Sequence, residues 1–389
     1  MCFAMAALTQ AALVLYTPAF LQIAAQFQIS SSQVRFTLAA YLLGFGLAQL
    51  PYGILSDHYG RKKLIIIGLV IFSLGCILSL LAHSYVELLS SRIIQGVGAG
   101  SCMTLSRAIM RDCFTGSDYV KGITYLSSGF AFGLGITPVI GGHLLDYFSW
   151  RSEFVFLLIC GLLLLTSVWT FLPETVKLQS IKLPTKVFFQ QTVRPLISVL
   201  KSKGFACYLV GGVAAYGVII TYNTMAPFLL QKTLAISSAQ FGWLTLIVAA
   251  TYYLATSFNR YFLKFVSVEN LLRIGLALIF LAGISLLLSK IYFNVINVYV
   301  ILIPMLFATF GQALIWSISI AFALKDLSHI AGTASALFSS LQMLLSALLS
   351  AIIAVPAEQD QIPMAVVVIF LAIISWVSFR FVKLPKSKR

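Results

Sequence analysis

The chain has few charged side chains, and acidic ones are the rarest of them. Only 10% of its 389 residues are charged, 60% are hydrophobic, and the mean hydropathy is +0.98. A soluble globular domain carries about 25% charged residues, so this class is excluded. The 11 acids stand against 26 Lys and Arg, which gives a net charge of +15. Such a surplus could indicate nucleic-acid binding, but these bases lie in short loops between apolar runs, as in membrane proteins.

Cysteine is scarce as well, and its spacing fits no metal site. Five of the six cysteines lie within or beside apolar runs, where cysteine acts mostly as a small apolar residue. We therefore expect no disulfide, no metal and no bound cofactor. The first apolar run lacks the basic start of a signal peptide and is followed by further runs, so we interpret it as a membrane span.

Long apolar runs make up most of the chain. A helix crosses a hydrocarbon layer of about 30 Å with about 20 residues. The pattern predicts an all-α membrane protein with twelve transmembrane helices in two six-helix repeats. We expect one bundle over residues 1–172, a cytoplasmic basic linker over 173–204 and a second bundle over 205–389. The predicted spans are Phe3–Ala25, Val34–Leu55, Leu64–Ala82, Val86–Ile109, Val120–Leu145, Phe154–Leu172, Phe205–Leu230, Phe241–Tyr261, Leu271–Ser289, Val298–Leu324, Gly332–Val355 and Pro363–Val382.

The basic residues predict the orientation. If both termini are cytoplasmic, 21 of the 26 Lys and Arg fall on the cytoplasmic side, four fall outside, and Arg92 lies within a span. Lys and Arg favour cytoplasmic loops, so this orientation is the expected one. We expect a multi-pass protein of the inner (plasma) membrane that is a monomer. Its partners would be the lipid bilayer and a small-molecule substrate, with no nucleic acid.

The loop between the second and third runs is short and carries one acid with three bases. Asp57, at the C-terminal end of its helix, faces an unfavourable helix dipole and needs a partner. The fourth span ends at the same surface with another acid and base. We therefore expect a cytoplasmic clamp between these groups. The residues of this predicted clamp and its loop are Gly53, Asp57, Gly60, Arg61, Lys62, Arg111 and Asp112.

This loop resembles the G-x-L-x-D-x-x-G-R-K motif of the major facilitator superfamily, which gates the cytoplasmic side during alternating access. Leu15 to Ala19 looks like the L-Y-x-P-A of its bicyclomycin/chloramphenicol-resistance (Bcr/CflA) subfamily, and Ala331 to Leu337 looks like the A-G-T-A-S-A-L start of that subfamily's eleventh helix. The resemblance covers the whole chain, with the specific motifs concentrated in the first half. It implies a secondary transporter of the drug:proton antiporter type. Such carriers bind substrate between two repeats near the membrane midplane.

Arg92 and Gln95 match the R-x-x-Q-G-x-G motif of fourth helices in this superfamily, where the arginine is implicated in proton coupling. Arg92 would lie about 10 Å below the outer surface. An arginine there costs up to about 3 kcal/mol unless it snorkels or has a partner. Two interpretations stay open. The side chain snorkels outward or bonds to backbone carbonyls, or it faces the central cavity.

The fifth span carries a glycine-rich run that is typical of close helix packing. The run also resembles the G-x-x-x-G-P-x-x-G-G "antiporter" motif, which marks exporters within the superfamily, with threonine in place of the glycine before proline. We expect Thr137 and Pro138 to form a packing and bending site rather than a ligand site. The residues of this antiporter-like motif are Gly133, Thr137, Pro138, Gly141 and Gly142.

No acid is expected deep within a span, because all eleven fall in loops or at span ends. A lipophilic cation in a dry cavity needs a buried anion, so the expected substrate is neutral, zwitterionic or anionic. Arg92 is the deep charge expected to meet it, and Arg35 lies near the outer mouth. His143 and Asp146, one turn apart at a span end, are the candidate titrating groups.

Several polar residues within spans are weaker cavity candidates, and each is equally well explained as a helix-packing hydrogen bonder. We expect proton-coupled efflux of drugs or small amphipathic compounds by alternating access. The alternative is export or import of a polar or anionic metabolite, such as a polycarboxylate siderophore. An enzyme is not expected, because no acid–base cluster lies at membrane depth. The weaker candidates are Tyr16, Tyr41, Gln49, Asn223, Gln312 and Trp316.

Overall fold

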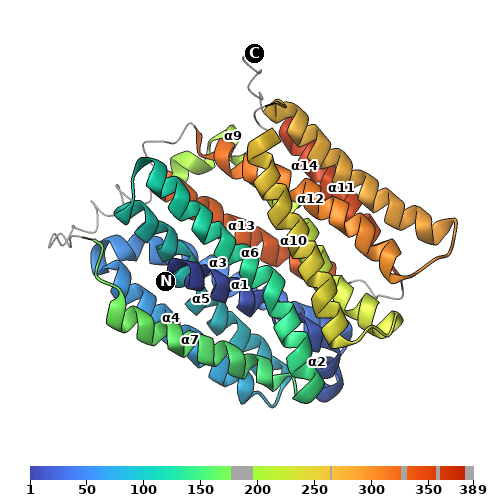
Figure 1. The fold of residues 1–389 in the computed structure, drawn as a ribbon, viewed down its shortest axis with the longest axis horizontal. Coiled ribbons are helices and arrows are strands. Elements are labelled where there is room, and N and C mark those ends of the chain that lie inside the picture. The colour runs from blue at the N-terminus through green and yellow to red at the C-terminus, as the bar shows by residue number, and fades with distance from the viewer. Residues whose placement is uncertain (177–195, 263–264, 326–330, 356–359, 382–389) are drawn as a thin grey trace.

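A computed structural model describes residues 1–176, 196–262, 265–325, 331–355 and 360–381. Within these ranges the regular structure is entirely helical, as the apolar runs predicted. Most of the basic linker expected at 173–204 lies outside the described residues, as does most of the basic tail. Figure 1 shows the helices as two groups that meet along α6 and α10.

The first group is built from the first half of the chain. Its first span is interrupted, because Pro18 has no N–H to donate and the backbone tightens into a 3₁₀ turn at that point. The helix of its second span extends beyond the apolar run to include Asp57. The elements are α1 (Cys2–Val14), η1 (Thr17–Ala19), α2 (Phe20–Phe27), α3 (Ser31–Tyr59), α4 (Arg61–Leu80), α5 (Tyr85–Cys113), α6 (Gly116–Tyr147) and α7 (Arg151–Phe171).

The second group repeats this plan with helices of similar length. Its first helix continues past Pro227 as a turn of π-helix. The elements are α9 (Lys203–Ala226), η2 (Pro227–Thr233), α10 (Ser238–Phe262), α11 (Val268–Ile291), α12 (Val298–Ala323), α13 (Ala331–Ala354) and α14 (Ile362–Arg380).

Eleven helices of the described chain are long and apolar enough to cross a membrane, counting α1 to α2 and α9 to η2 as one span each. The twelfth expected span, α5, has 29 residues but lower hydropathy, because it carries Arg92, Gln95 and several serines. It packs against α3, α4 and α1 at the centre of the first group. Lipid therefore does not need to solvate its polar side chains.

Two hydrogen-bonded capping boxes begin equivalent helices of the two groups. Ser30 accepts from the Gln33 N–H at 3.3 Å, and the Gln33 side chain accepts from the Ser30 N–H at 3.0 Å. Ser237 and Gln240 make the same pair of bonds at the start of α10, at 3.2 and 3.1 Å. Each box satisfies N–H groups that the first helical turn leaves without partners. The serine and glutamine pattern shared by the two halves is therefore a repeated helix start.

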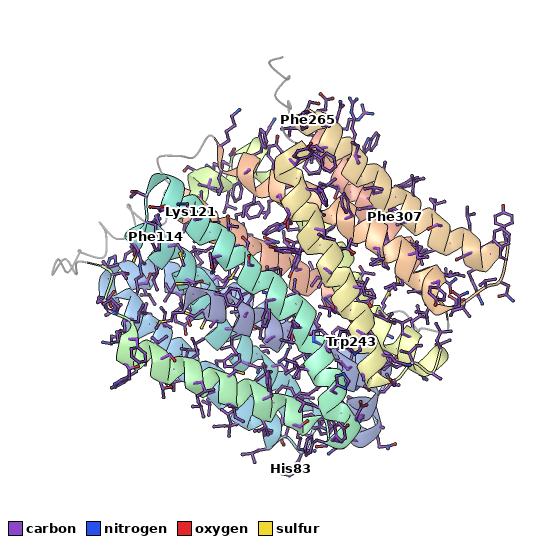
Figure 2. The ribbon with its side chains drawn as sticks, viewed as in Figure 1. His83, Phe114, Lys121, Trp243, Phe265 and Phe307 are labelled. Atoms are coloured by element: carbon purple, nitrogen blue, oxygen red, sulfur yellow. The ribbon has the colours of Figure 1, made fainter. Side chains whose placement is uncertain are left out.

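The two groups touch mainly through two helix pairs, α3 with α13 and α6 with α10, and α2 also meets η2. Small residues allow the approach. A Cβ on Gly46 would lie 2.9 Å from the Leu344 backbone, and one on Gly142 would lie 2.8 Å from Ala239 Cα. Phe114, Lys121 and Phe265 mark the end of the molecule predicted to be cytoplasmic, and His83 marks the opposite end (Figure 2). We call these the inner and outer ends.

Candidate functional site

Arg61 is the centre of a charge cluster at the inner end. The side chain is 4% exposed, and it pairs with Asp57 Oδ1 at 2.5 Å and with Asp112 Oδ2 at 3.1 Å. It also donates to the Ser56 hydroxyl. One guanidinium thus joins the end of α3, the start of α4 and the end of α5. Arginine suits this role because its planar fork holds several donors in fixed directions.

Glu174, just after α7, completes the cluster. Its carboxylate accepts from the backbone N–H of Arg61 at 2.8 Å and of Lys62 at 3.2 Å. An anion at a helix N-terminus is stabilised by the unpaired N–H groups and the helix dipole. The turn requires Gly60, because its φ of 91° is a left-handed value and a Cβ would collide with Glu174. Sequence reasoning did not place Glu174 in this cluster.

The clamp predicted from the sequence therefore forms in part. Asp57, Arg61 and Asp112 come together, while Arg111 is exposed and takes no part in the cluster. Gly53 lies next to α13, where an added Cβ would be 3.6 Å from Ala336 Cβ. All the paired charges belong to the first group of helices. The gating role of the clamp stays a prediction.

Arg92 is fully buried and enclosed by aromatic rings. Its guanidinium carbon lies 4.1 Å from the centre of the Tyr16 ring and 4.7 Å from that of Tyr41. Nη2 donates to the Ala12 carbonyl at 2.8 Å, and Nη1 donates to the Gln95 side chain. Of the two open interpretations, the structure shows bonding to a backbone carbonyl. Arg92 does not line the two cavities described below, and its expected contact with the substrate stays a prediction.

Two narrow cavities meet between the helix groups, and both are bounded by Phe130 and Tyr216. The walls combine aromatic rings with amide side chains from both halves of the chain. Four of the cavity candidates, Gln49, Asn223, Gln312 and Trp316, lie in these walls, while Tyr41 bonds to the Thr9 carbonyl instead. The other lining residues include Gln10, Phe45, Leu134, Thr245, Tyr252, Ser339 and Gln342.

Arg107 is the one charged side chain among the described residues that line these cavities. It comes from α5, near the inner end, and Nη1 donates to the Ser339 hydroxyl of α13 at 2.5 Å. Sequence reasoning treated it as a cytoplasmic base at the end of a span. The signal that could have found it is its position, because two helical turns of α5 follow it before the helix ends at Cys113.

Several amide oxygens and nitrogens in the cavity walls have no protein partner. Both polar atoms of Gln312 are buried without a hydrogen bond, as are Gln49 Oε1, Asn223 Oδ1 and Trp316 Nε1. Leaving such groups unpaired costs about 1–3 kcal/mol each. The cavity therefore offers donors and acceptors that a polar ligand or water can satisfy.

The antiporter-like motif lies where α6 packs on both α1 and α10. Gly133 and Gly141 face α1, where added Cβ atoms would meet the carbonyls of Ala7 and Leu15. Gly142 faces Ser238 of α10, and the Pro138 backbone meets Gly242 of that helix. Thr137 donates to the carbonyl one turn before it. The motif packs one half of the molecule on the other, and its effect on transport stays a prediction.

The remaining predicted residues lie toward the outer end. Arg35 is buried, donates to the Ala354 carbonyl at 3.2 Å and lies 5.0 Å from the centre of the Phe228 ring. It therefore joins the two halves rather than lining an open mouth. His143 and Asp146 lie 3.6 Å apart and are about half exposed. The His143 ring also meets the ring of Trp243, which lies beside α6 in Figure 2.

Glu153 lies at a span end, as expected for every acid, but its burial there was not predicted. Glu153 is 0% exposed in the first turn of α7. Its carboxylate lies beside α6, and Oε1 is 2.9 Å from the position that a Cβ on Gly141 would take. Neither carboxylate oxygen has a hydrogen bond. The sequence places Glu153 at a span end, where water would normally solvate it, but the packing of α1, α6 and α7 closes over it.

The comparisons with known proteins agree with this architecture. The family model described as Major Facilitator Superfamily matches residues 2–351, and the chain belongs to this superfamily. It is similar to the bicyclomycin resistance protein homolog of Haemophilus influenzae, at 26% identity over 94% of this chain and 91% of that protein. It is also similar to multidrug resistance protein D of Escherichia coli, at 26% identity over 91% and 88%.

A solved structure shows the same fold at lower sequence similarity. The D-xylose–proton symporter superposes with a TM-score of 0.78 at 19% identity, and the match covers 98% of this chain and 97% of the symporter. The protein is thus an all-α, multi-pass membrane transporter, related to drug-resistance transporters of the bicyclomycin and chloramphenicol kind, and not an enzyme.

Proposed function

We propose that this protein exports small, amphipathic, neutral or anionic compounds, driven by the proton gradient. Both termini face the cytoplasm, a single chain is the working unit, and no cofactor or metal takes part. Relatives whose names give bicyclomycin and chloramphenicol resistance support export of such compounds. The proton is the driving ion of the proposal, because the drug:proton antiporter resemblance implies it.

The observation that carries the substrate class is the composition of the cavity walls. Aromatic rings such as Phe45, Phe130 and Trp316 offer apolar surface, and unpaired amides offer hydrogen bonds. Arg107 is the charged lining group among the described residues. A cationic drug would meet this positive charge without a carboxylate in the wall. This charge would not repel a neutral or anionic compound, so the cavity favours these two classes of substrate.

Transport by the purified protein in lipid vesicles tests this proposal. Radiolabelled chloramphenicol, a neutral compound, should accumulate only when a pH gradient of the correct direction is imposed. A lipophilic cation offered at the same concentration should not accumulate. Transport of the cation in preference to chloramphenicol would contradict the proposed substrate class.

The positive charge of Arg107 also supports a second candidate function, which is transport of a polar or anionic metabolite. The variant Arg107→Gln separates the two, because it removes the charge and keeps a hydrogen-bond donor. Affinity for an anionic compound should fall by about tenfold or more, since one lost charge-assisted hydrogen bond costs about 1.5–3 kcal/mol. Affinity for chloramphenicol should change little. The exposed Arg111, one turn further along α5, gives the matched control Arg111→Gln.

A further inference from the structure

Glu153 is a buried acid that the substrate cavity does not use. Among the described residues it is the one fully buried Asp or Glu, and neither carboxylate oxygen has a hydrogen bond. It lies outside both cavities between the helix groups. An unpaired ionised carboxylate in an apolar interior costs several kcal/mol. A carboxyl group without a partner in a position closed to water is therefore held neutral, and it can ionise only in a second state in which it is paired.

Arg92 is the charged group that approaches Glu153, because its guanidinium carbon lies 5.8 Å from the centre of the ring of Phe154, the next residue of α7. The two side chains are near each other but are not joined, because the Arg92 donors go to the Ala12 carbonyl at 2.8 Å and to Gln95. The Nε donor has no hydrogen-bond partner. The guanidinium therefore has two alternative sets of hydrogen-bond acceptors. It can hold the α1 backbone and Gln95, or it can turn to an ionised Glu153.

We infer that Glu153 is the proton-binding residue of this transporter and that Arg92 is its switching partner; this inference rests on the proton-coupled transport proposed above. When Glu153 is ionised, it pairs with Arg92. When one proton from water adds to a carboxylate oxygen, the group becomes a neutral carboxylic acid. Arg92 then returns to Ala12 and Gln95, as seen here, and keeps its own proton throughout because a guanidinium is not deprotonated in proteins.

The surroundings supply what the neutral acid needs. The Leu15 carbonyl and Glu153 Oε1 both crowd the position of a Cβ on Gly141, so a carbonyl lies on the same side of Glu153, although the two groups are not hydrogen-bonded here. Pro18 has no N–H, and the Ala19 N–H bonds to the Tyr16 carbonyl. The 3₁₀ turn thus leaves the Leu15 carbonyl directed at α6. The glycine of the antiporter-like motif makes the room in which both oxygens fit.

The other titratable groups near Glu153 already have partners. Tyr16, at the end of α1, interacts electrostatically with Glu153 and bonds to the Thr37 hydroxyl at 3.0 Å. Cys76 of α4 accepts from Gln95. On α6, His143 and Asp146 pair with each other at the half-exposed outer end. On α7 itself, Arg151 donates to the carbonyls of Leu80 and Ala82. Arg92 is therefore the group that responds to the charge of Glu153.

Helix α1 connects this proton site to the substrate cavity. Arg92 holds the Ala12 carbonyl, and Gln10, half a turn earlier on the same helix, lines the cavity. Tyr41, which stacks on Arg92, holds the Thr9 carbonyl at 2.7 Å. Turning Arg92 toward Glu153 releases its bond to α1. Protonation and substrate binding thus act on one helix, which is the physical basis for coupling.

The first test measures the proton site without any substrate. Infrared spectra of the full chain are recorded in detergent between about pH 4 and 9, the range over which carboxyl groups titrate in proteins. The C=O band of a protonated carboxylic acid should be present in the wild type and absent in Glu153→Gln. Its intensity should change with pH in one step. The control Glu87→Gln, an exposed acid at the outer end, should keep this band.

The proposal is overturned if Glu153→Gln removes no such band, or if the band it removes does not change with pH. Because Glu153→Gln is isosteric, it should remain folded, and its thermal unfolding midpoint is measured alongside. If it does not fold, Glu153→Asp provides the second variant. Its shorter carboxylic acid should give a pH-dependent band at a shifted frequency, and loss of pH dependence there would also contradict the proposal.

The second test measures coupling in lipid vesicles with chloramphenicol as the probe. Glu153→Gln should lose accumulation driven by a pH gradient, to the level of vesicles without protein. It should retain exchange of labelled for unlabelled chloramphenicol, which needs no net proton movement. Glu153→Asp should recover part of the gradient-driven uptake. Equal gradient-driven uptake by wild type and Glu153→Gln would overturn the assignment. Absence of all chloramphenicol transport in the wild type would instead contradict the proposed substrate, and the infrared test would still decide the proton site.

Discussion

Gly142→Ala should open the outer end of the molecule. The residue lies in the antiporter-like motif, and a Cβ there would meet the Ser238 carbonyl and lie 2.8 Å from Ala239 Cα of α10. Both are backbone atoms, so no side-chain rotation relieves the overlap. Contacts below 3 Å of this kind force α6 and α10 apart.

The size of the effect follows from the overlap. Overpacking of this kind costs about 1–3 kcal/mol, and it acts only where the two helices touch. If α6 and α10 separate in the state that is open to the outside, the added Cβ has no cost there. The whole cost then falls on the state in which the outer end is closed. The equilibrium between the two states should then shift by about 5- to 150-fold toward the outward-open one.

The shift can be measured with two spin labels at the outer end. Tyr147 at the end of α6 is 81% exposed, and Gln240 near the start of α10 is also exposed, so cysteines at both positions can carry labels. The exposed native Cys113 is first replaced by serine. In Gly142→Ala, the distance distribution between the labels should move to longer values than in the parent protein.

Gly129→Ala is the matched control. A Cβ at Gly129 also meets backbone, at 3.1 Å from Phe3 Cα, but that contact joins α6 to α1 within the first helix group. The control should lower the thermal unfolding midpoint and leave the label distances unchanged. An unchanged distribution in Gly142→Ala, or an equal change in both variants, would refute the reasoning.

Three further outcomes are expected. Arg61→Gln should lower the free energy of unfolding, measured by denaturation in detergent, by about 2–4 kcal/mol, because it leaves the mostly buried Asp112 carboxylate unpaired. The control Lys63→Gln, at an exposed position, should have little effect. Pro138→Ala should change transport rate or leak more than affinity; a tenfold weaker affinity at unchanged maximal rate would show that this site binds ligand. Ser30→Ala should cost about 1 kcal/mol through the lost capping box of α3, and a change within error would show that the box is not needed.

Local patterns were enough to predict much of the inner-end cluster. The spacing of Asp57 and Arg61 places them one helical turn apart, and Gly60 marks the break between two helices. These relations follow from the geometry of one short segment. Glu174 was missed because it reaches the same turn from more than a hundred residues away, and nothing in its own segment indicates where α7 ends relative to α4.

The same limit explains why the surroundings of Arg92, Arg107 and Glu153 were not predicted. Hydropathy gives the depth of a residue along its helix, but it does not give the direction in which the side chain points or what lies opposite. Arg107 reaches the cavity because α5 turns that face toward α13, where Ser339 accepts its hydrogen bond. Arg92, on the same helix, faces α1 instead.

The sequence by itself determined the number and order of the membrane helices, the two-part plan and the superfamily motifs. Each of these depends on composition or on contacts within a few residues, which one segment encodes alone. The tertiary structure alone decided that Glu153 is buried, that Arg107 and not Arg92 lines the cavity, and that Gly141 and Gly142 face different helices. These facts depend on the rotation and register of helices packed together, which are set by the combined fit of many side chains.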